Sequence, residues 1–131
     1  MIHFRLDPRL GTPTYAQLVH QVRRAVLQGT LGPGDQLPTA REVVAALAIN
    51  PNTVLKAYSE LEHEGIVYSR PGLGTFIADT APAPLDAQVR RRLQKQLDAW
   101  LAKARAAGLD EETAFALFAS GVQEAYGADV A

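Results

Sequence analysis

Four polar side chains near the middle of the sequence have the types that bind nucleic-acid bases and phosphates. They are Arg41, Asn52, Thr53 and Lys56. Arginine can donate two parallel hydrogen bonds to guanine O6 and N7, or hold a phosphate. Asparagine can bridge adenine N6 and N7, threonine can contact a thymine methyl group or a phosphate, and lysine can bind a phosphate or guanine. Together these residue types indicate contact with double-stranded DNA.

Each of these side chains also has a purely structural explanation. Arg41 could be a solvated arginine paired with Glu42 or Glu60. The asparagine and the threonine could serve only as helix caps, and the lysine could simply be exposed. Their placement on helices therefore matters, since base-reading side chains lie in the first turns of a helix that enters the major groove.

Two short helices with a tight joint between them are predicted to carry these side chains. Thr39 followed by Glu42 has the pattern of a capping box, which begins a helix that buries Val43, Val44 and Leu47. A few residues later, Asn50 suits the N-cap of another helix. Its first position is Pro51, where the missing N–H is not needed. Two such helices form a helix-turn-helix.

The second of these helices has a buried stripe and a defined end. Its apolar stripe consists of Val54, Tyr58 and Leu61, and Gly65 is placed to end it. Tyr58 fits the hydrophobic core, although its hydroxyl could instead reach a phosphate. This helix is the predicted recognition helix.

The residues before the helix-turn-helix predict a strand and a helix. Ile2, Phe4 and Leu6 alternate with polar residues, which is the period of a short half-buried strand. From Tyr15 the apolar positions recur every three or four residues, which predicts a helix. Gly29 is placed to end that helix in the left-handed conformation.

A hairpin is predicted after the recognition helix. Ile66–Arg70 and Gly74–Ile77 are β-prone runs that flank a turn containing proline and glycine. Arg70, Gly72 and Gly74 would form a wing that approaches the DNA backbone, because glycine lets the main chain come close to phosphates. An ordinary tight hairpin is the alternative. Helix, helix-turn-helix and hairpin together describe a winged helix.

The C-terminal part is predicted to be helical. Apolar residues recur every three or four positions as far as Gly108, which indicates a helix of roughly 20 residues and ~30 Å. Asp110 then caps a last helix, with Glu111 and Glu112 in its first turn. These helices would expose too much apolar surface for a monomer unless they pack on the winged helix, so a two-fold dimer is predicted. The predicted interface consists of Leu85, Val89, Leu93, Leu97, Trp100, Leu101, Phe115, Phe118 and Val122.

The fold class expected from these elements is α+β. Residues 1–78 form the winged helix-turn-helix, residues 79–84 a proline-rich linker, and residues 85–131 a two-helix dimerisation segment. The chain has no cysteine and its three histidines are scattered, so neither a disulfide framework nor a metal site is expected.

Composition narrows the function less than the motifs do. The net charge is only −1, so a DNA footprint must come from the placement of basic residues. No apolar run reaches the ~20 residues that cross a bilayer, and the N-terminus lacks the apolar core of a signal peptide, so a cytoplasmic protein without membrane contact is expected. No catalytic constellation or cofactor motif is recognisable. A winged helix used for protein interaction is the competing function, although apolar residues would then be expected in place of the four polar ones.

Several motifs occurring together over about residues 2–78 resemble the GntR family of bacterial repressors, and within it the short YtrA-type branch. In chain order the motifs are PTYAQL at 13–18, GTLGPGDQLP at 29–38, TARE at 39–42, NPNTV at 50–54, KAY at 56–58, LE and EG within 61–65, and Gly72, Gly74, Thr75 and Phe76. Many members carry arginine near the start of the recognition helix and again four residues later. Pro51 and Leu55 stand there in this chain, so base reading is expected to shift onto Asn52, Thr53 and Lys56.

The resemblance implies a DNA-binding winged helix followed by a C-terminal domain for dimerisation and, often, for sensing an effector. It implies a repressor that acts as a homodimer, and the branch is associated with membrane-transporter operons. A two-fold dimer presents two identical recognition helices, so its operator should be an inverted repeat. A small-molecule effector of unknown identity stays open. The DNA-binding residues expected are Thr39, Arg41, Asn50, Asn52, Thr53, Lys56, Tyr58, Arg70, Gly72 and Gly74.

Overall fold

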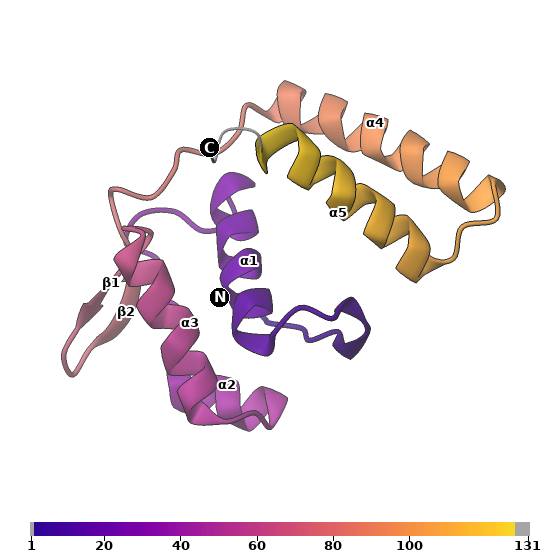
Figure 1. The fold of residues 1–131 in the computed structure, drawn as a ribbon. Coiled ribbons are helices and arrows are strands. Elements are labelled where there is room, and N and C mark those ends of the chain that lie inside the picture. Colours follow the sequence, from indigo (N-terminus) through magenta and orange to yellow (C-terminus); the bar gives the residue numbers. More distant parts are fainter. Residues whose placement is uncertain (1, 128–131) are drawn as a thin grey trace. The chain divides into compact units, whose positions relative to one another are not determined.

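The computed structural model describes residues 2–127. Contacts within the chain divide it into two units that meet between Asp86 and Ala87, and these are called the winged-helix unit and the helical unit below. The winged-helix unit contains a 3₁₀ turn and three helices followed by a hairpin, and the helical unit contains two long helices (Figure 1). The predicted α+β fold, a winged helix-turn-helix followed by two helices, is confirmed.

Three helices and a hairpin enclose the core of the winged-helix unit. In chain order its elements are the 3₁₀ turn Pro8–Leu10, α1 (Thr14–Leu27), α2 (Ala40–Leu47), α3 (Pro51–His63), β1 (Val67–Arg70) and β2 (Gly74–Ile77). Helix α3 is central, because it packs against α1, α2 and β1. The largest fully buried side chains in the core are Leu18, Val22, Leu37, Val54, Leu61 and Ile77. Burying an aliphatic side chain of this size contributes roughly 1.5–3 kcal/mol, so these residues hold α3 in place.

The predicted helix starts are confirmed. The Thr39 hydroxyl accepts a hydrogen bond from the backbone amide of Glu42 at 3.1 Å, and the Glu42 carboxylate accepts one from the Thr39 amide at 3.3 Å. These two bonds are the predicted capping box. At the start of α3, the Asn50 side chain accepts a 2.8 Å hydrogen bond from the amide of Asn52, and Pro51 occupies the first helical position.

The predicted helix ends are confirmed as well. Gly29, Gly65 and Gly108 all have φ between 78° and 89°, the left-handed region that side chains with a Cβ resist. Each glycine amide donates to the carbonyl three residues back, and the next amide donates to the carbonyl five residues back. This is the Schellman arrangement, which satisfies carbonyl groups that the helix leaves without partners.

The two strands of the hairpin pair with each other as predicted, and a third segment lies beside β2. Strands β1 and β2 are antiparallel, with Val67 opposite Ile77 and Arg70 opposite Gly74. The preceding segment 34–37 runs along the other side of β2, where the Leu37 amide donates to the Thr75 carbonyl at 2.8 Å. The hairpin is therefore attached at both edges, to α3 through β1 and to this segment through β2.

The prediction of a strand at the N-terminus is wrong. Residues 2–6 have no regular secondary structure, although Phe4 is buried as the alternation indicated. Two glutamines of α1 supply the hydrogen bonds that a neighbouring strand would have made. The amide of Arg5 donates to the Gln21 side chain at 2.9 Å, and the amide of Asp7 donates to the buried Gln17 side chain at 2.9 Å.

The segment predicted as a linker, residues 79–84, and the following Leu85 are fastened to the helix ends of the winged-helix unit. The Thr80 hydroxyl donates to the Gly65 carbonyl at 2.5 Å, and the Leu85 amide donates to the Leu27 carbonyl at 2.8 Å. Gly65 and Leu27 lie at the C-terminal ends of α3 and α1. The segment therefore satisfies main-chain groups that these helix ends leave open.

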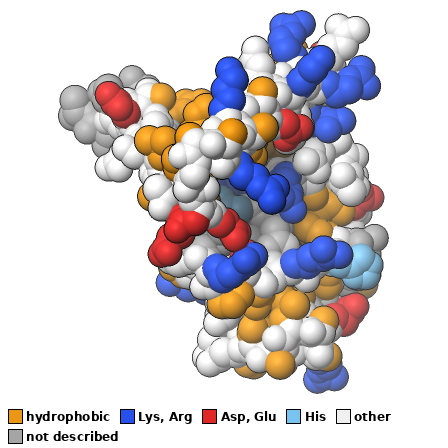
Figure 2. Space-filling model, turned by 90° about the vertical axis from the view of Figure 1, so that its right-hand side faces the viewer, with side chains coloured by type: hydrophobic (Ala, Val, Ile, Leu, Met, Phe, Trp, Pro, Cys, Tyr) orange, Lys and Arg blue, Asp and Glu red, His pale blue; other side chains and the backbone are white. Residues whose placement is uncertain are grey.

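The helical unit consists of α4 (Ala87–Ala106) and α5 (Glu111–Gly127). Asp110 caps α5 as predicted, accepting a 2.7 Å hydrogen bond from the Thr113 amide, and hydrogen bonds from Thr113 lower the pKa of this carboxyl. Among the described residues of the helical unit, only Ala104 is buried. Hydrophobic side chains accordingly reach the surface of this unit, in the upper part of Figure 2.

No helix within residues 2–127 is both long enough and apolar enough to cross a membrane. Residues 128–131, the end of the predicted dimerisation segment, lie outside the described part of the chain.

Candidate nucleic-acid interface

Arg41 is presented at the start of α2. The capping box fixes the first turn of this helix, and Arg41 lies within that turn with its side chain exposed. Among the described residues no ion pair joins Arg41 to a carboxylate, including Glu42 and Glu60, which the sequence offered as partners. The Thr39 hydroxyl itself is used within the capping box, so its role is to place the turn that carries the arginine.

Asn52 and Thr53 lie in the first turn of α3, but neither of their side chains caps the helix. That function belongs to Asn50, whose side-chain oxygen accepts from the Asn52 amide. The side-chain NH₂ group of Asn50 keeps its two N–H donors, because only the side-chain oxygen of Asn50 is used in the cap. The side chain of Asn52 is exposed and that of Thr53 is half-buried. Asn52 and Thr53 are therefore not the helix caps that the structural explanation required. Both side chains stay available to contact DNA at the end of α3 that is expected to enter a groove.

Lys56 is held by an aromatic ring. Its Nζ atom lies 3.9 Å from the centroid of the Tyr15 ring at the start of α1, within the range of a cation–π contact. The lysine side chain is otherwise exposed on α3. A ring contact leaves the ammonium charge intact and does not use its three N–H donors in ordinary hydrogen bonds. Tyr15 therefore positions a cation at the surface that could bind a phosphate.

Tyr58 belongs to the core. Its side chain is 8% exposed, and its hydroxyl donates a 2.6 Å hydrogen bond to the Pro38 carbonyl. Burial, together with the negative charge of Glu42, raises the pKa of this hydroxyl. A hydroxyl that is buried and already bonded to the main chain is not presented to a phosphate, so Tyr58 is left out of the interface proposed below.

The wing is latched by a glutamine that the sequence analysis missed. Gln36 donates from Nε2 to the Leu73 carbonyl at 3.1 Å, at the tip of the hairpin. Gly72 and Gly74 have φ of 77° and 132°, and a Cβ on Gly74 would lie 2.6 Å from Gln36 Nε2. The glycines are therefore needed for the turn and for the latch. Arg70 is exposed at the end of β1, at the base of this tip.

One exposed apolar residue on α3 also escaped the prediction. The side chain of Leu55 is 55% exposed in the recognition helix. Its place in the sequence is one where the family resemblance implies arginine. The signal was present, since an apolar residue outside the buried stripe of an amphipathic helix must face solvent or a partner.

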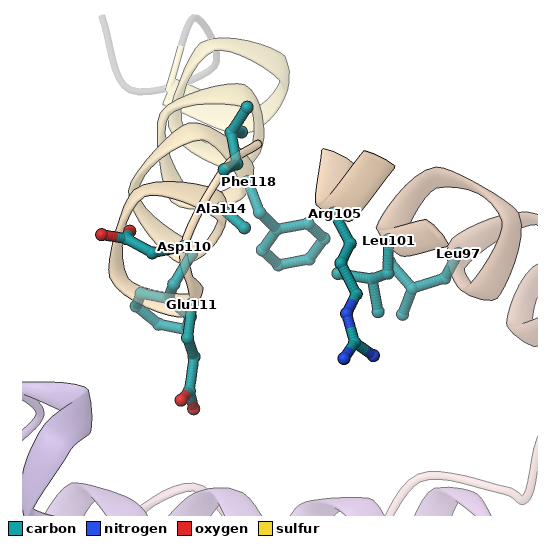
Figure 3. Close-up of a pocket in the computed structure, with 9 residues that line it drawn as sticks. Leu97, Leu101, Arg105, Asp110, Glu111, Ala114 and Phe118 are labelled. Atoms are coloured by element: carbon teal, nitrogen blue, oxygen red, sulfur yellow. The ribbon is translucent and has the colours of Figure 1, made fainter. Parts of the chain in front are cut away.

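The helical unit carries a second candidate surface. Most of the predicted dimer residues in this unit, namely Val89, Leu93, Leu101, Phe115, Phe118 and Val122, are exposed, and Leu97 and Trp100 are half-buried. Leu85, also predicted for the dimer interface, is exposed but belongs to the winged-helix unit. A groove of about 690 Å³ separates α4 from α5, and Phe118 points across it toward Leu101 (Figure 3). Trp100 and Phe118 make a tilted ring contact at 6.2 Å. Leu117, which was missed, adds to this apolar surface.

Comparisons with known proteins agree with this geometry. The family described as bacterial regulatory proteins, gntR family, matches residues 14–77, from α1 through β2. HTH-type transcriptional repressor YtrA of Bacillus subtilis (strain 168) is 40% identical over 108 residues, which cover 82% of this chain and 83% of that protein. The relatedness thus extends beyond the winged helix into the helical unit.

Two solved structures are similar to the fold. YtrA from Sulfolobus acidocaldarius, a GntR-family transcription factor, is 29% identical with a TM-score of 0.51 and covers 76% of this chain and 97% of that one. AraR(DBD) in complex with operator ORX1 is 29% identical with a TM-score of 0.50 and covers 60% of this chain and 93% of that one. This chain belongs to the GntR family of bacterial regulatory proteins and is a DNA-binding regulator of transcription, not an enzyme.

Proposed function

We propose that this chain represses transcription by binding an inverted-repeat operator as a homodimer. The observation that supports it most directly is the exposed set on the helix-turn-helix: Arg41 in the first turn of α2, and Asn52 and Lys56 in the first turns of α3. Helix α3 would lie in the major groove, where arginine and asparagine read base edges and lysine neutralises a phosphate. Thr39 and Asn50 cap the two helices and so place these groups.

The wing supports the same proposal. Arg70 and the glycine tip would contact the backbone or the minor groove, because main-chain amides at glycines can approach phosphates closely. Gln36 holds the tip through the Leu73 carbonyl, three residues after Arg70. The similarity to AraR(DBD), whose structure was solved with an operator, also favours operator DNA as the partner.

Dimerisation is supported by the helical unit. Two helices with almost no buried side chain cannot gain enough hydrophobic stabilisation from each other alone. A second copy placed on the α4–α5 face would cover Leu101, Phe115 and Phe118. The rim of the groove carries Arg105 near the end of α4 and Asp110 at the start of α5, so a two-fold arrangement can pair opposite charges.

Selection of genomic fragments by the full-length protein tests the proposal, followed by footprinting and by binding at several salt concentrations. We expect two protected half-sites in opposite orientation. The logarithm of affinity should fall against log salt by roughly 0.9 for each phosphate neutralised. Protection of one asymmetric half-site with a slope near zero would contradict the proposal and favour a protein-interaction module. A membrane-transporter operon is the target that the resemblance to the YtrA-type branch implies, and the selected fragments identify the genes.

The groove between α4 and α5 has the size of a small-molecule site as well as of a dimer contact. An effector bound there would control the protein only if it bound the monomer and the dimer unequally. A thermal-shift screen with small metabolites tests this, and no shift across a broad panel would favour control by protein level alone.

A further inference from the structure

We propose that Leu55 recognises a thymine methyl group in the major groove of the operator. The inference rests on the proposed function, because it assigns a base to one residue of the proposed DNA-reading helix. The motivating feature is a leucine on the outer face of α3 that is 55% exposed, on a helix whose exposed positions also include Asn52 and Ser59.

The exposure of Leu55 is unusual within its own unit. In the described part of the winged-helix unit, only Leu55 and Leu73 are large apolar side chains that are more than half exposed. Leu55 lies on α3 and Leu73 at the tip of the wing. Tyr68, the other large apolar side chain of the hairpin that is exposed, stacks on Phe76 with ring centroids 5.7 Å apart. The two most exposed of the large apolar side chains described in this unit are thus found on the two elements proposed to touch DNA.

Helical spacing places Leu55 among the proposed base-reading residues. It follows Asn52 by three positions and precedes Ser59 by four, and residues at these spacings are neighbours on a helix surface. Asn52, Lys56 and Ser59 are all exposed, whereas the stripe that faces the core consists of Val54, Ala57, Tyr58 and Leu61. Leu55 therefore faces the same side as Asn52.

Only one group on the base edges of the major groove is apolar and so complementary to a leucine side chain. Base edges there display hydrogen-bond donors and acceptors, and the C5 methyl of thymine is the apolar group among them. Leucine placed against the methyl buries apolar surface. Placed against a guanine or cytosine edge it would remove water from polar groups without replacing their hydrogen bonds. Leu55 would therefore favour thymine by attraction and disfavour guanine and cytosine by desolvation.

The experiment uses the full-length protein and the operator obtained by selection. Each thymine of the half-site is replaced in turn by deoxyuridine, symmetrically in both half-sites, which removes the methyl group and keeps the base pair. We expect one position at which the replacement weakens binding about fourfold per half-site, the equivalent of about 0.8 kcal/mol for one buried methyl group. Other positions should give smaller effects.

Variants of Leu55 assign that effect to the leucine. With Leu55→Ala the deoxyuridine penalty at this position should disappear, and alanine is a strong helix former, so α3 should persist. Leu55→Met keeps an apolar side chain of similar volume and should keep the penalty. Leu73→Ala, at the wing tip, removes an equally exposed leucine and should also keep it.

The outcomes distinguish failure of the proposed function from failure of the role assigned to Leu55. If the wild-type protein selects no fragment, the proposed function fails and the inference fails with it. If it binds an operator whose thymines all tolerate deoxyuridine, or whose half-sites contain no required thymine, only the inference is overturned. A penalty that persists in Leu55→Ala would also overturn it, because the methyl group is then read by another residue, such as Thr53.

Discussion

The Tyr58 hydroxyl donates a 2.6 Å hydrogen bond to the carbonyl of Pro38, twenty residues earlier in the chain. Pro38 directly precedes Thr39, the cap of α2, while Tyr58 lies in the middle of α3. The bond therefore ties the recognition helix to the start of the helix that carries Arg41. Both groups are buried, so water cannot readily replace either partner.

Replacing Tyr58 with phenylalanine should destabilise the winged helix by about 1–3 kcal/mol, because the buried Pro38 carbonyl loses its partner. Urea denaturation followed by circular dichroism measures the change. Tyr68→Phe is the matched control, since Tyr68 is exposed on the hairpin and its substitution should change the free energy of unfolding little. Equal stability of Tyr58→Phe and the wild-type protein would show that the hydrogen bond contributes nothing.

Stability should fall at alkaline pH, and Tyr58 should account for part of the fall. Burial raises the pKa of Tyr58 in the folded protein above its ordinary value of 10.0. Its contribution is therefore fully present below pH 10 and is lost as the pH rises toward the folded-state pKa, by up to about 1.4 kcal/mol per pH unit. Urea denaturation between pH 8 and pH 11 should show a shallower decline for Tyr58→Phe, and parallel curves would contradict the assignment.

Local signals explain why the helix ends could be predicted from the sequence. Thr39 with Glu42, Asn50 with Pro51, and the glycine at position 65 act through bonds within a few residues of the chain. Alternating hydrophobicity at residues 2–6 also predicted which side chains point inward. It could not predict the partners of the main-chain amides, since those are the side chains of Gln17 and Gln21, which lie ten and sixteen residues from the amides they bind.

The candidate interface was predictable in part for the same reason. Residue types and helix position indicated Arg41 and Asn52. Whether the Tyr58 hydroxyl faces a phosphate or a carbonyl depends on the packing of α3 against the segment before α2, which the sequence pattern does not encode. The contact of Lys56 with Tyr15 likewise joins two helices that are distant in the chain.

Arg41 and Lys56 should affect DNA binding in different ways. If Arg41 reads a base, Arg41→Ala should cost about 1–3 kcal/mol on the operator and relax the preference at one position per half-site. Lys56→Ala should weaken binding to all sequences similarly and reduce the salt slope by about 1 per subunit. Binding to an operator panel at several salt concentrations measures both. Lys103→Ala, in α4 and outside the groove, is the control and should leave the sequence preference unchanged.

A charge on the α4–α5 face should break the dimer. Leu101 is exposed and lines the groove, so Leu101→Glu would place a carboxylate in the proposed interface, where desolvating it is unfavourable. Sedimentation should show a monomer with weaker operator binding and an intact winged helix. Leu101→Met, which keeps the apolar volume, should stay dimeric. A dimeric Leu101→Glu protein would place the interface elsewhere.

Loss of the glutamine latch should loosen the wing. Gln36 is exposed, yet its hydrogen bond to the Leu73 carbonyl holds the tip beside Arg70, so Gln36→Ala should leave the core intact and weaken operator binding. A hydrogen bond of this kind contributes about 0.5–1.5 kcal/mol, which corresponds to a roughly twofold to tenfold loss of affinity. The salt slope should also fall, because a mobile wing places Arg70 less often against a phosphate. Gln28→Ala, an exposed glutamine at the end of α1, should change neither quantity. If Gln36→Ala and Gln28→Ala bind the operator equally well, the wing does not depend on the latch.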